Sequence, residues 1–232
     1  MKDGSDIIKE AKARGETTLS EHDSKRLLAK YGVPVTREVL TGSRAEAVTA
    51  AQSLGFPVVV KGCSAAIAHK TERGLVELDL TDAEAVGSAF DRMRARVPGI
   101  GVLVQEMVVG RRELILGLVR DPQFGPCVSL GIGGIFTEAV ADVVFRVAPF
   151  ALAEAVAMMD DLKNCALLGS FRGLPAVDRG VLAEALVALG RIGAEHEDIR
   201  EIDVNPLVIC GSRPIAVDAL IVLGRPISSV VS

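Results

Sequence analysis

A strand, bend and strand pattern near the C-terminus constrains the fold more than any other feature. Residues 201–209 read Glu-Ile-Asp-Val-Asn-Pro-Leu-Val-Ile, where apolar residues alternate or run on as they do in strands. Pro206 would break a central ladder, so the pattern predicts a tight bend there. Residues 211–214 form a plausible hairpin turn into a further strand that reaches Asp218. Such a hairpin would bring Asn205 and Asp218 side by side.

Asn205 and Asp218 offer the hard oxygen ligands of a magnesium site. Mg²⁺ takes only one or two protein oxygens and completes its octahedron with water and substrate phosphates, so the pair implies a bound nucleotide. The alternative is that Asn205-Pro206 merely begins a turn and that Asp218 faces solvent, since Asn-Pro pairs are turn formers. The spacing alone fits both interpretations.

Composition favours sheets covered by helices and argues against a nucleic-acid surface. The chain has 232 residues, of which 49% are hydrophobic and only 3% aromatic, so Val, Leu, Ile and Ala must fill the core. Its net charge is −4, and the Lys and Arg residues are scattered instead of forming a basic field. We therefore expect small molecules or proteins as partners.

The cysteines and the N-terminus favour a cytoplasmic location. Four cysteines lie far apart with no C-x-x-C pair, which argues against a zinc ribbon or a disulfide framework. The first six residues contain acids where a signal peptide would be basic and then apolar. No run reaches the roughly 18 apolar residues that a membrane span needs. We expect reduced thiols and no membrane contact.

The order of predicted elements indicates an α+β protein. Ser43-x-x-Glu46 is a capping box that opens a helix ending at Gly55, and a buried strand follows at 57–61. Three later strands follow one another without an intervening helix and favour an antiparallel sheet; they lie at 102–107, 113–119 and 127–131. Further helices are predicted at 5–14, 20–31, 151–162 and 179–195.

Lys61 and Glu106 are two further features that point to a nucleotide. Lys61 ends a run of three valines, so its ammonium would project at a strand terminus, where phosphate is a natural counter-charge. Glu106 ends a predicted strand that runs into a linker, whose backbone groups could bind an adenine edge. A lone lysine at a strand end is a weak signal of nucleotide binding. Lys61, Glu106 and the C-terminal hairpin together all point to a bound nucleotide.

The glycine-rich segment Gly131-Ile132-Gly133-Gly134 lacks the strand and helix that would flank a dinucleotide fingerprint. Its backbone N–H groups could form a nest for an anion. The alternative is a tight turn without a ligand. Asp142 and Arg146 lie just beyond, where they would either line the cleft or form a structural ion pair.

Taken together and in order, six motifs resemble the ATP-grasp β subunit of ADP-forming acetyl-CoA (acyl-CoA) synthetases, which are related to succinyl-CoA synthetases. The likeness covers about residues 17–223. The motifs are Val58-Val59-Val60-Lys61, His69-Lys70-Thr71-Glu72, Leu103-Val104-Gln105-Glu106-Met107-Val108, Asp121-Pro122-x-Phe124-Gly125-Pro126, Gly131-x-Gly133-Gly134-Ile135, and Glu201-Ile202-Asp203-x-Asn205-Pro206-Leu207 with Asp218.

The resemblance implies a role for each motif. Asn205 and Asp218 would hold Mg²⁺, Lys61 would hold the phosphates of ATP or ADP, and Glu113 would bind the ribose. The glycine loop would receive a phosphohistidine loop from a partner. The adenine would lie against Gln105, Glu106, Met107 and Val108.

Two residues of the second motif are the candidate catalytic groups. His69 would relay a phosphoryl group to ADP, because a neutral imidazole nitrogen attacks phosphorus and the phosphoimidazole stays reactive. Lys70 would neutralise the charge in transit. His22 and His196 have no motif around them and carry no predicted role.

The resemblance also implies an ATP-grasp fold with a nucleotide bound between two lobes, a smaller one at 17–105 and a larger one at 106–232. The reaction would be acyl-CoA + ADP + phosphate ⇌ carboxylic acid + CoA + ATP. An α subunit, or a fused region, would supply acyl-CoA binding and the first phosphohistidine. Two alternatives remain open: a stand-alone ATP-grasp carboxylate ligase, and a non-catalytic module that binds Mg-ATP.

Overall fold

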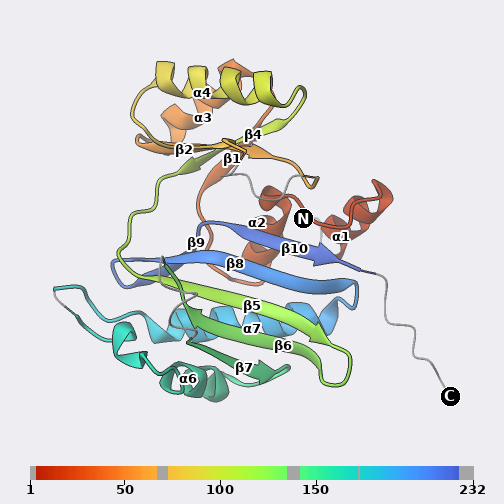
Figure 1. Cartoon of the computed structure of the whole chain (residues 1–232), viewed down its shortest axis with the longest axis vertical. Helices are drawn as coiled ribbons and strands as arrows, with labels where there is room; N and C mark the ends of the chain where they lie inside the picture. The colour runs from red at the N-terminus through yellow and green to blue at the C-terminus, as the bar shows by residue number, and fades with distance from the viewer. Residues whose placement is uncertain (1–3, 67–72, 135–141, 172, 225–232) are drawn as a thin grey trace. The chain divides into compact units, whose positions relative to one another are not determined.

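A computed structural model describes residues 4–66, 73–134, 142–171 and 173–224. The chain divides into two compact units. We call Ser20–His22 with Thr36–Val108 the small unit, and Met1–Leu19, Asp23–Val35 and Val109–Ser232 the large unit. Figure 1 draws both with their helices and strands.

The small unit is a four-stranded antiparallel sheet in the order β1-β4-β2-β3, packed against two helices. The predicted capping box opens the first helix, since the Ser43 side chain accepts a hydrogen bond from the Glu46 N–H, and Gly55 follows the helix with a φ of 88°. The strands are β1 (Glu38–Thr41), β2 (Val58–Cys63), β3 (Val76–Leu80) and β4 (Gly101–Glu106), and the helices are α3 (Arg44–Leu54) and α4 (Ala83–Arg96).

The two faces of this small sheet differ in character. Val58 and Val60 of β2 belong to the apolar core shared with α3 and α4. Because side chains alternate along a strand, Lys61 lies on the opposite face of β2. Gln105 lies on that same opposite face of β4, since its neighbour Val104 is a core residue.

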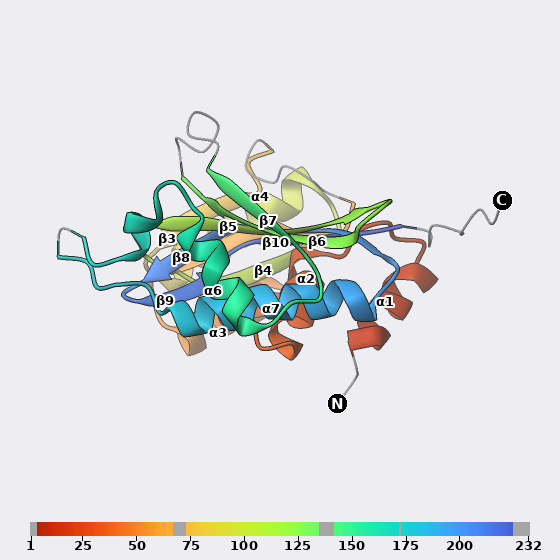
Figure 2. The ribbon, with the colours of Figure 1, turned by 90° about the horizontal axis from the view of Figure 1, so that it is seen from below.

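The large unit is built on an antiparallel sheet in the order β10-β8-β5-β6-β7, with β9 paired to β8. Its helices α6 and α7 lie together on one side of this sheet, as Figure 2 shows. The strands are β5 (Glu113–Asp121), β6 (Gly125–Ile132), β7 (Val143–Val147), β8 (Ile199–Cys210), β9 (Arg213–Ala216) and β10 (Ala219–Leu223). The helices are α1 (Gly4–Ala13), α2 (Glu21–Lys30), α6 (Leu152–Asp160), the 3-10 turn η1 (Cys165–Leu168) and α7 (Arg179–Glu195).

The division of the chain differs from the one expected at residues 17–105 and 106–232. Residues 23–35 belong to the large unit, because Leu27, Leu28 and Val33 are buried in its core. The division therefore passes through the first turn of α2, whose residues Glu21 and His22 are grouped with the small unit.

None of the helices within the described residues has the length and apolar composition needed to cross a membrane.

Candidate nucleotide and metal site

The hairpin expected near the C-terminus is present and brings Asn205 beside Asp218. The Asn205-Pro206 peptide is cis, and the Asn205 N–H donates to the Asp218 carbonyl at 3.3 Å. One residue further along, the Val217 N–H donates to the Pro206 carbonyl at 3.0 Å. The tight bend expected at Pro206 is wrong, because β8 runs through it as one strand and only its pairing with β5 shifts register there. The return through β9 places the Asn205 amide and the Asp218 carboxylate on adjacent backbone.

Asp203 is a third oxygen donor at this hairpin, and we did not place it among the metal ligands from the sequence. Its position two residues before Asn205 puts both on one face of β8. Burial raises the pKa of the Asp203 carboxyl, and the negative charges of Glu201 and Asp218 raise it further. The i, i+2 spacing of Glu201, Asp203 and Asn205 was the signal that could have identified it.

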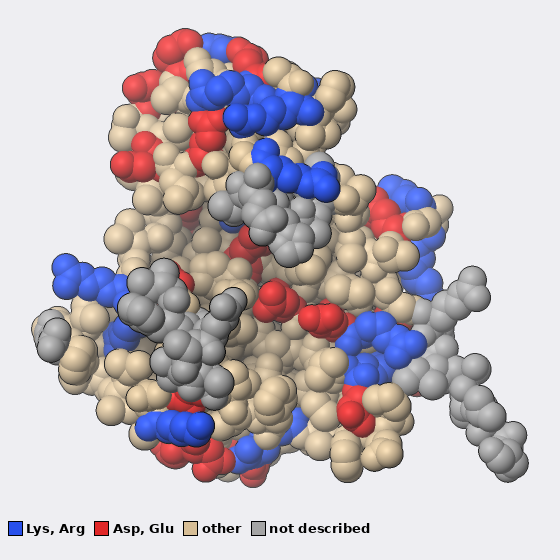
Figure 3. Space-filling model, in the orientation of Figure 1, with Lys and Arg blue, Asp and Glu red and all other residues tan. Residues whose placement is uncertain are grey.

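This donor set fits a magnesium ion that is shared with phosphates. Figure 3 shows acidic side chains over the middle of the large sheet. In the part of the chain that the structure describes, no three His, Cys, Asp or Glu side chains converge into a metal cage. Mg²⁺ needs only one or two carboxylates besides substrate oxygens. A cation would also relieve the repulsion from Glu201 and Asp218, which adds to burial in raising the pKa of Asp203.

Lys25 supports the same hairpin from α2. Its side chain is only 1% exposed, and its ammonium donates to the Val217 carbonyl at 3.3 Å, next to Asp218. The contact lies within the large unit. The sequence does not predict this contact, because a lysine beside Leu27 and Leu28 in an amphipathic helix ordinarily faces solvent.

Lys61 is buried inside a strand, and the expectation that it projects from a strand end was wrong. β2 continues to Cys63, because Gly62 and Cys63 pair with Val102 and Gly101 of β4. The Lys61 ammonium lies 2.7 Å from the Glu21 carboxylate, and the two side chains are 6% and 2% exposed. We did not predict a role for Glu21.

The segment expected to bind adenine begins at the end of β4. Gln105 is fully buried in register with Glu38 and Val59. The Glu106 carboxylate accepts hydrogen bonds from the Arg37 backbone N–H at 2.8 Å and from its Nε at 2.6 Å. Because Arg37 holds this carboxylate, a purine edge would meet the main chain that follows, at Met107 and Val108.

Gly131 lies within β6 and Gly133 follows the strand, and both allow a close approach between strands. The Gly133 N–H donates to the Glu113 carbonyl at 2.8 Å, and a Cβ at Gly133 would lie only 3.0 Å from the Glu113 carbonyl carbon. A Cβ at Gly131 would lie 3.0 Å from the Val143 side chain. Gly134 has a φ of 98°, which favours glycine. These contacts give the glycines a packing role, and their predicted anion-binding role stays a prediction.

A cavity of about 130 Å³ adjoins Glu113 and Gly133 in the large unit. Arg112 lines it while its guanidinium donates to the carbonyls of Leu167, Gly169 and Pro175, which fixes the loop after α6. The other lining residues are Arg111, Leu114, Ile132, Leu167, Leu168, Val177 and Ile209.

Asp142 and Arg146 have structural contacts. Arg146 forms ion pairs with Glu154 and Asp161 of the α6 region. The Asp142 carboxylate accepts from the backbone N–H groups of Lys163 and Asn164, at 2.9 and 2.8 Å. Burial acts to raise the pKa of Asp142, but the hydrogen bonds from Asn164 and Lys163 outweigh it, so the pKa is lowered.

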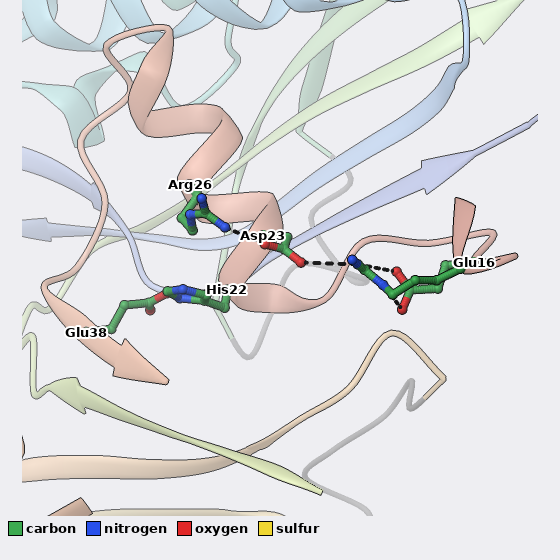
Figure 4. A network of polar contacts seen from close by, with 6 residues as sticks. Glu16, His22, Asp23, Arg26 and Glu38 are labelled. Carbon is green, nitrogen blue, oxygen red and sulfur yellow. Dashed lines mark hydrogen bonds and ion pairs between the residues drawn. The ribbon is translucent and has the colours of Figure 1, made fainter. Parts of the chain in front are cut away.

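His69 and Lys70, the two predicted catalytic residues, lie outside the described residues. His22 points toward Glu38 in Figure 4, with its Nδ1 at 2.9 Å from the carboxylate. His196 lies 2.8 Å from the Tyr31 hydroxyl. The contacts of His22 and His196 link structural elements.

Comparisons with known proteins agree with this geometry. A family model described as an ATP-grasp domain matches residues 10–223. The β subunit of acetate–CoA ligase [ADP-forming] I from Pyrococcus furiosus is 36% identical over 225 residues, which cover 94% of this chain and 97% of that protein.

Solved structures of acetyl-coenzyme A synthetase 1 from Ca. Korarchaeum cryptofilum are also similar. One, in complex with coenzyme A and Ca-AMPCP, is 41% identical with a TM-score of 0.90, and the match covers 96% of this chain and 100% of that chain. A second holds coenzyme A and Mg-AMPPCP, and its phosphohistidine segment points towards the nucleotide-binding site. It is 40% identical with a TM-score of 0.86 at the same coverage. The chain therefore belongs to the ATP-grasp family and, within it, to the β subunits of ADP-forming acetate–CoA ligases.

Proposed function

We propose that this chain is the nucleotide-binding subunit of an ADP-forming acyl-CoA synthetase, which interconverts acyl-CoA, ADP and phosphate with a carboxylic acid, CoA and ATP. The observation that carries the proposal is the β8 hairpin, where the Asn205 N–H meets the Asp218 carbonyl at 3.3 Å and Asp203 shares the strand face of Asn205. This set of oxygens suits a nucleotide-bound Mg²⁺.

Asn205 and Asp218 hold the metal in this proposal, with Asp203 beside them. When bound, Mg²⁺ supplies positive charge to the phosphate oxygens between which the phosphoryl group moves. Lys61 contributes an ammonium to the phosphates, and Glu113 accepts from the ribose hydroxyls. The main chain at Met107 and Val108, after Gln105 and Glu106, binds the adenine edge.

His69 carries the phosphoryl group in this proposal. A neutral imidazole nitrogen takes the group from a partner's phosphohistidine and passes it to the terminal oxygen of ADP, while Lys70 offsets the negative charge in transit. The glycine loop at Gly131, Gly133 and Gly134 receives the partner's segment.

An α subunit provides CoA binding and the first phosphohistidine. Support comes from the relative in Pyrococcus furiosus, which is named a β subunit, and from the Ca. Korarchaeum cryptofilum structure with its phosphohistidine segment. Cytoplasmic location is part of the same proposal.

Labelling with [γ-³²P]ATP tests the proposal. The chain is incubated with Mg²⁺ and labelled ATP, with and without a candidate α subunit, and the label is then challenged with acid and base. We expect acid-labile, base-stable label that is lost in His69→Ala and retained in the matched histidine control His196→Gln. Asp218→Asn should abolish labelling as well.

The other outcomes identify the alternatives. Tight binding of Mg-ATP without any labelling in the presence of the α subunit would indicate a non-catalytic module. ATP-dependent ligation of an acid to an amine by the chain alone, unaffected by His69→Ala, would indicate a stand-alone carboxylate ligase. Either result contradicts the proposed phosphohistidine route.

A further inference from the structure

The small unit contains an oppositely charged pair in its interior. Lys61 of β2 and Glu21 of α2 are separated by 2.7 Å, with side chains 6% and 2% exposed. The pair of Arg92 and Glu77 in the same unit is different, since its side chains are 50% and 21% exposed. The first pair is thus almost fully removed from water, whereas the second remains at the surface.

Burial makes the two members of the interior pair depend on each other. Removal from water penalises the charged form of an amine, and a carboxylate within hydrogen-bond distance favours it. Glu21 stands in the first turn of α2, where the helix dipole favours a negative charge. The helix start therefore helps to keep Glu21 ionised, and Glu21 in turn helps to keep Lys61 an ammonium.

The pair also has a fixed position on the sheet. Val58 and Val60 point into the core with α3 and α4, so Lys61 lies on the other face of β2. Its register partner on β4 is Leu103, which is fully buried. Other titratable groups of the small unit near this face are His22, next to Glu21 in the chain, and Glu38, which binds the His22 ring.

We infer that Glu21 is a positioning residue for Lys61: it keeps the buried amine charged and directs it so that it can bind the phosphates of a nucleoside diphosphate. The inference rests on the proposed function, in which Lys61 binds those phosphates. An ammonium has three N–H donors, so a bond to Glu21 is compatible with a second bond to a phosphate oxygen. Glu21 acts through Lys61 and does not itself touch the nucleotide.

The test is the pH dependence of Mg-ADP binding to the purified full chain, measured by titration calorimetry between pH 6 and pH 9.5. In Glu21→Gln the amine loses its counter-charge and gives up its proton at a lower pH. We expect affinity close to that of the wild type at pH 6 and a loss of affinity, relative to the wild type, that grows steadily as the pH rises to 9.5. Glu77→Gln is the matched control, and it should bind as the wild type does at every pH.

Glu21→Asp separates charge from position. It keeps the carboxylate and withdraws it by one methylene, so we expect weaker binding at every pH with the wild-type pH dependence. Circular dichroism and thermal melting establish that each variant is folded. If Glu21→Gln does not fold, Glu21→Asp decides: wild-type affinity in that variant overturns the inference. In a folded Glu21→Gln, wild-type affinity across the pH range overturns it equally.

Lys61→Ala distinguishes failure of this inference from failure of the proposed function. If Lys61→Ala binds Mg-ADP like the wild type, the phosphate role of Lys61 is wrong. If Lys61→Ala loses binding while both Glu21 variants keep wild-type behaviour, the role of Lys61 stands and only the positioning role of Glu21 is wrong.

Discussion

The candidate site residues of the two units differ in how their charges are arranged. In the small unit, Lys61 is matched with Glu21 at 2.7 Å, and Glu106 is held by Arg37. In the large unit, like charges gather along β8, where Glu201 and Asp218 add to the burial that raises the pKa of Asp203.

The contrast indicates what each arrangement is suited to do. An oppositely charged pair in the interior holds a side chain in one state and one place, and breaking it is costly. Neighbouring carboxylates repel one another, and a bound cation stabilises their charged forms. In the proposed function, the small unit presents a fixed ammonium and the large unit attracts a metal ion.

The largest effect should come from breaking the interior pair on one side. Lys61→Met leaves the Glu21 carboxylate buried without its ammonium, and we expect a loss of about 3–5 kcal/mol in the free energy of unfolding. The double variant Lys61→Met with Glu21→Met should recover most of that loss, because two apolar side chains replace two charges. Urea denaturation measures both. Equal stabilities of the single and double variants would remove the basis for calling the pair interdependent.

Replacing the acidic residues at the β8 hairpin should leave the fold intact and abolish the stabilisation of the chain by Mg-ADP. At a Mg-ADP concentration 100-fold above Kd, binding stabilises a protein by about 2.7 kcal/mol. We expect Asp218→Asn and Asp203→Asn to lose most of that gain, and Asp203→Asn to keep the stability of the unliganded chain because a repulsion is relieved. Thermal melting with and without Mg-ADP is the measurement, and an unchanged ligand-induced shift would argue against the metal site.

Asp142 sharpens the contrast because it lies in the same large unit as Asp203, but its pKa is lowered whereas that of Asp203 is raised. The pKa of Asp142 is lowered in the folded state, so its carboxylate stabilises the fold at pH values above its ordinary pKa of 3.8. This stabilisation is lost as the pH falls through the folded-state pKa. Asp142→Asn should lower the free energy of unfolding by about 2 kcal/mol at pH 7. An amide has one acceptor oxygen and cannot accept all of the N–H groups of Lys163 and Asn164 that bind the carboxylate. The difference from the wild type should vanish in strong acid, and a difference that is independent of pH would contradict the electrostatic explanation.

The smallest effect concerns the support of the hairpin by α2. Lys25→Met removes the ammonium that binds the Val217 carbonyl, so the backbone next to Asp218 should be held less firmly. We expect about tenfold weaker Mg²⁺ affinity in the presence of ADP, as is common when a partner of a metal ligand is lost. Lys30→Met, an exposed lysine of the same helix, is the control. Equal Mg²⁺ affinities of the two variants would show that Lys25 serves packing only.

Much of the fold and part of the site could be read from local signals. Period-two alternation located β8, and Ser43 with Glu46 marked the start of α3. These succeed because backbone conformation and capping depend on neighbouring residues. The hairpin partners Asn205 and Asp218 were found for the same reason.

The contacts that the sequence did not reveal join distant segments. Glu21 reaches Lys61 from 40 residues away, and Lys25 reaches Val217 from 192 residues away. Charged residues in a helix are ordinarily exposed, so nothing in the neighbouring sequence indicates that Glu21 and Lys25 are buried. The run of three valines before Lys61 predicts a strand that ends there, whereas pairing with β4 continues through Gly62.

The central claim is that the β8 hairpin holds the metal ion of a bound nucleotide. Anomalous diffraction from crystals of the chain grown with ADP and Mn²⁺ tests it most directly, because Mn²⁺ takes the oxygen ligands that suit Mg²⁺ and can be located by its scattering. We expect the manganese signal beside the Asp218 carboxylate, with Asn205 and Asp203 adjacent. A manganese ion bound to ADP elsewhere on the chain, with these three side chains making no contact to it, would contradict the claim.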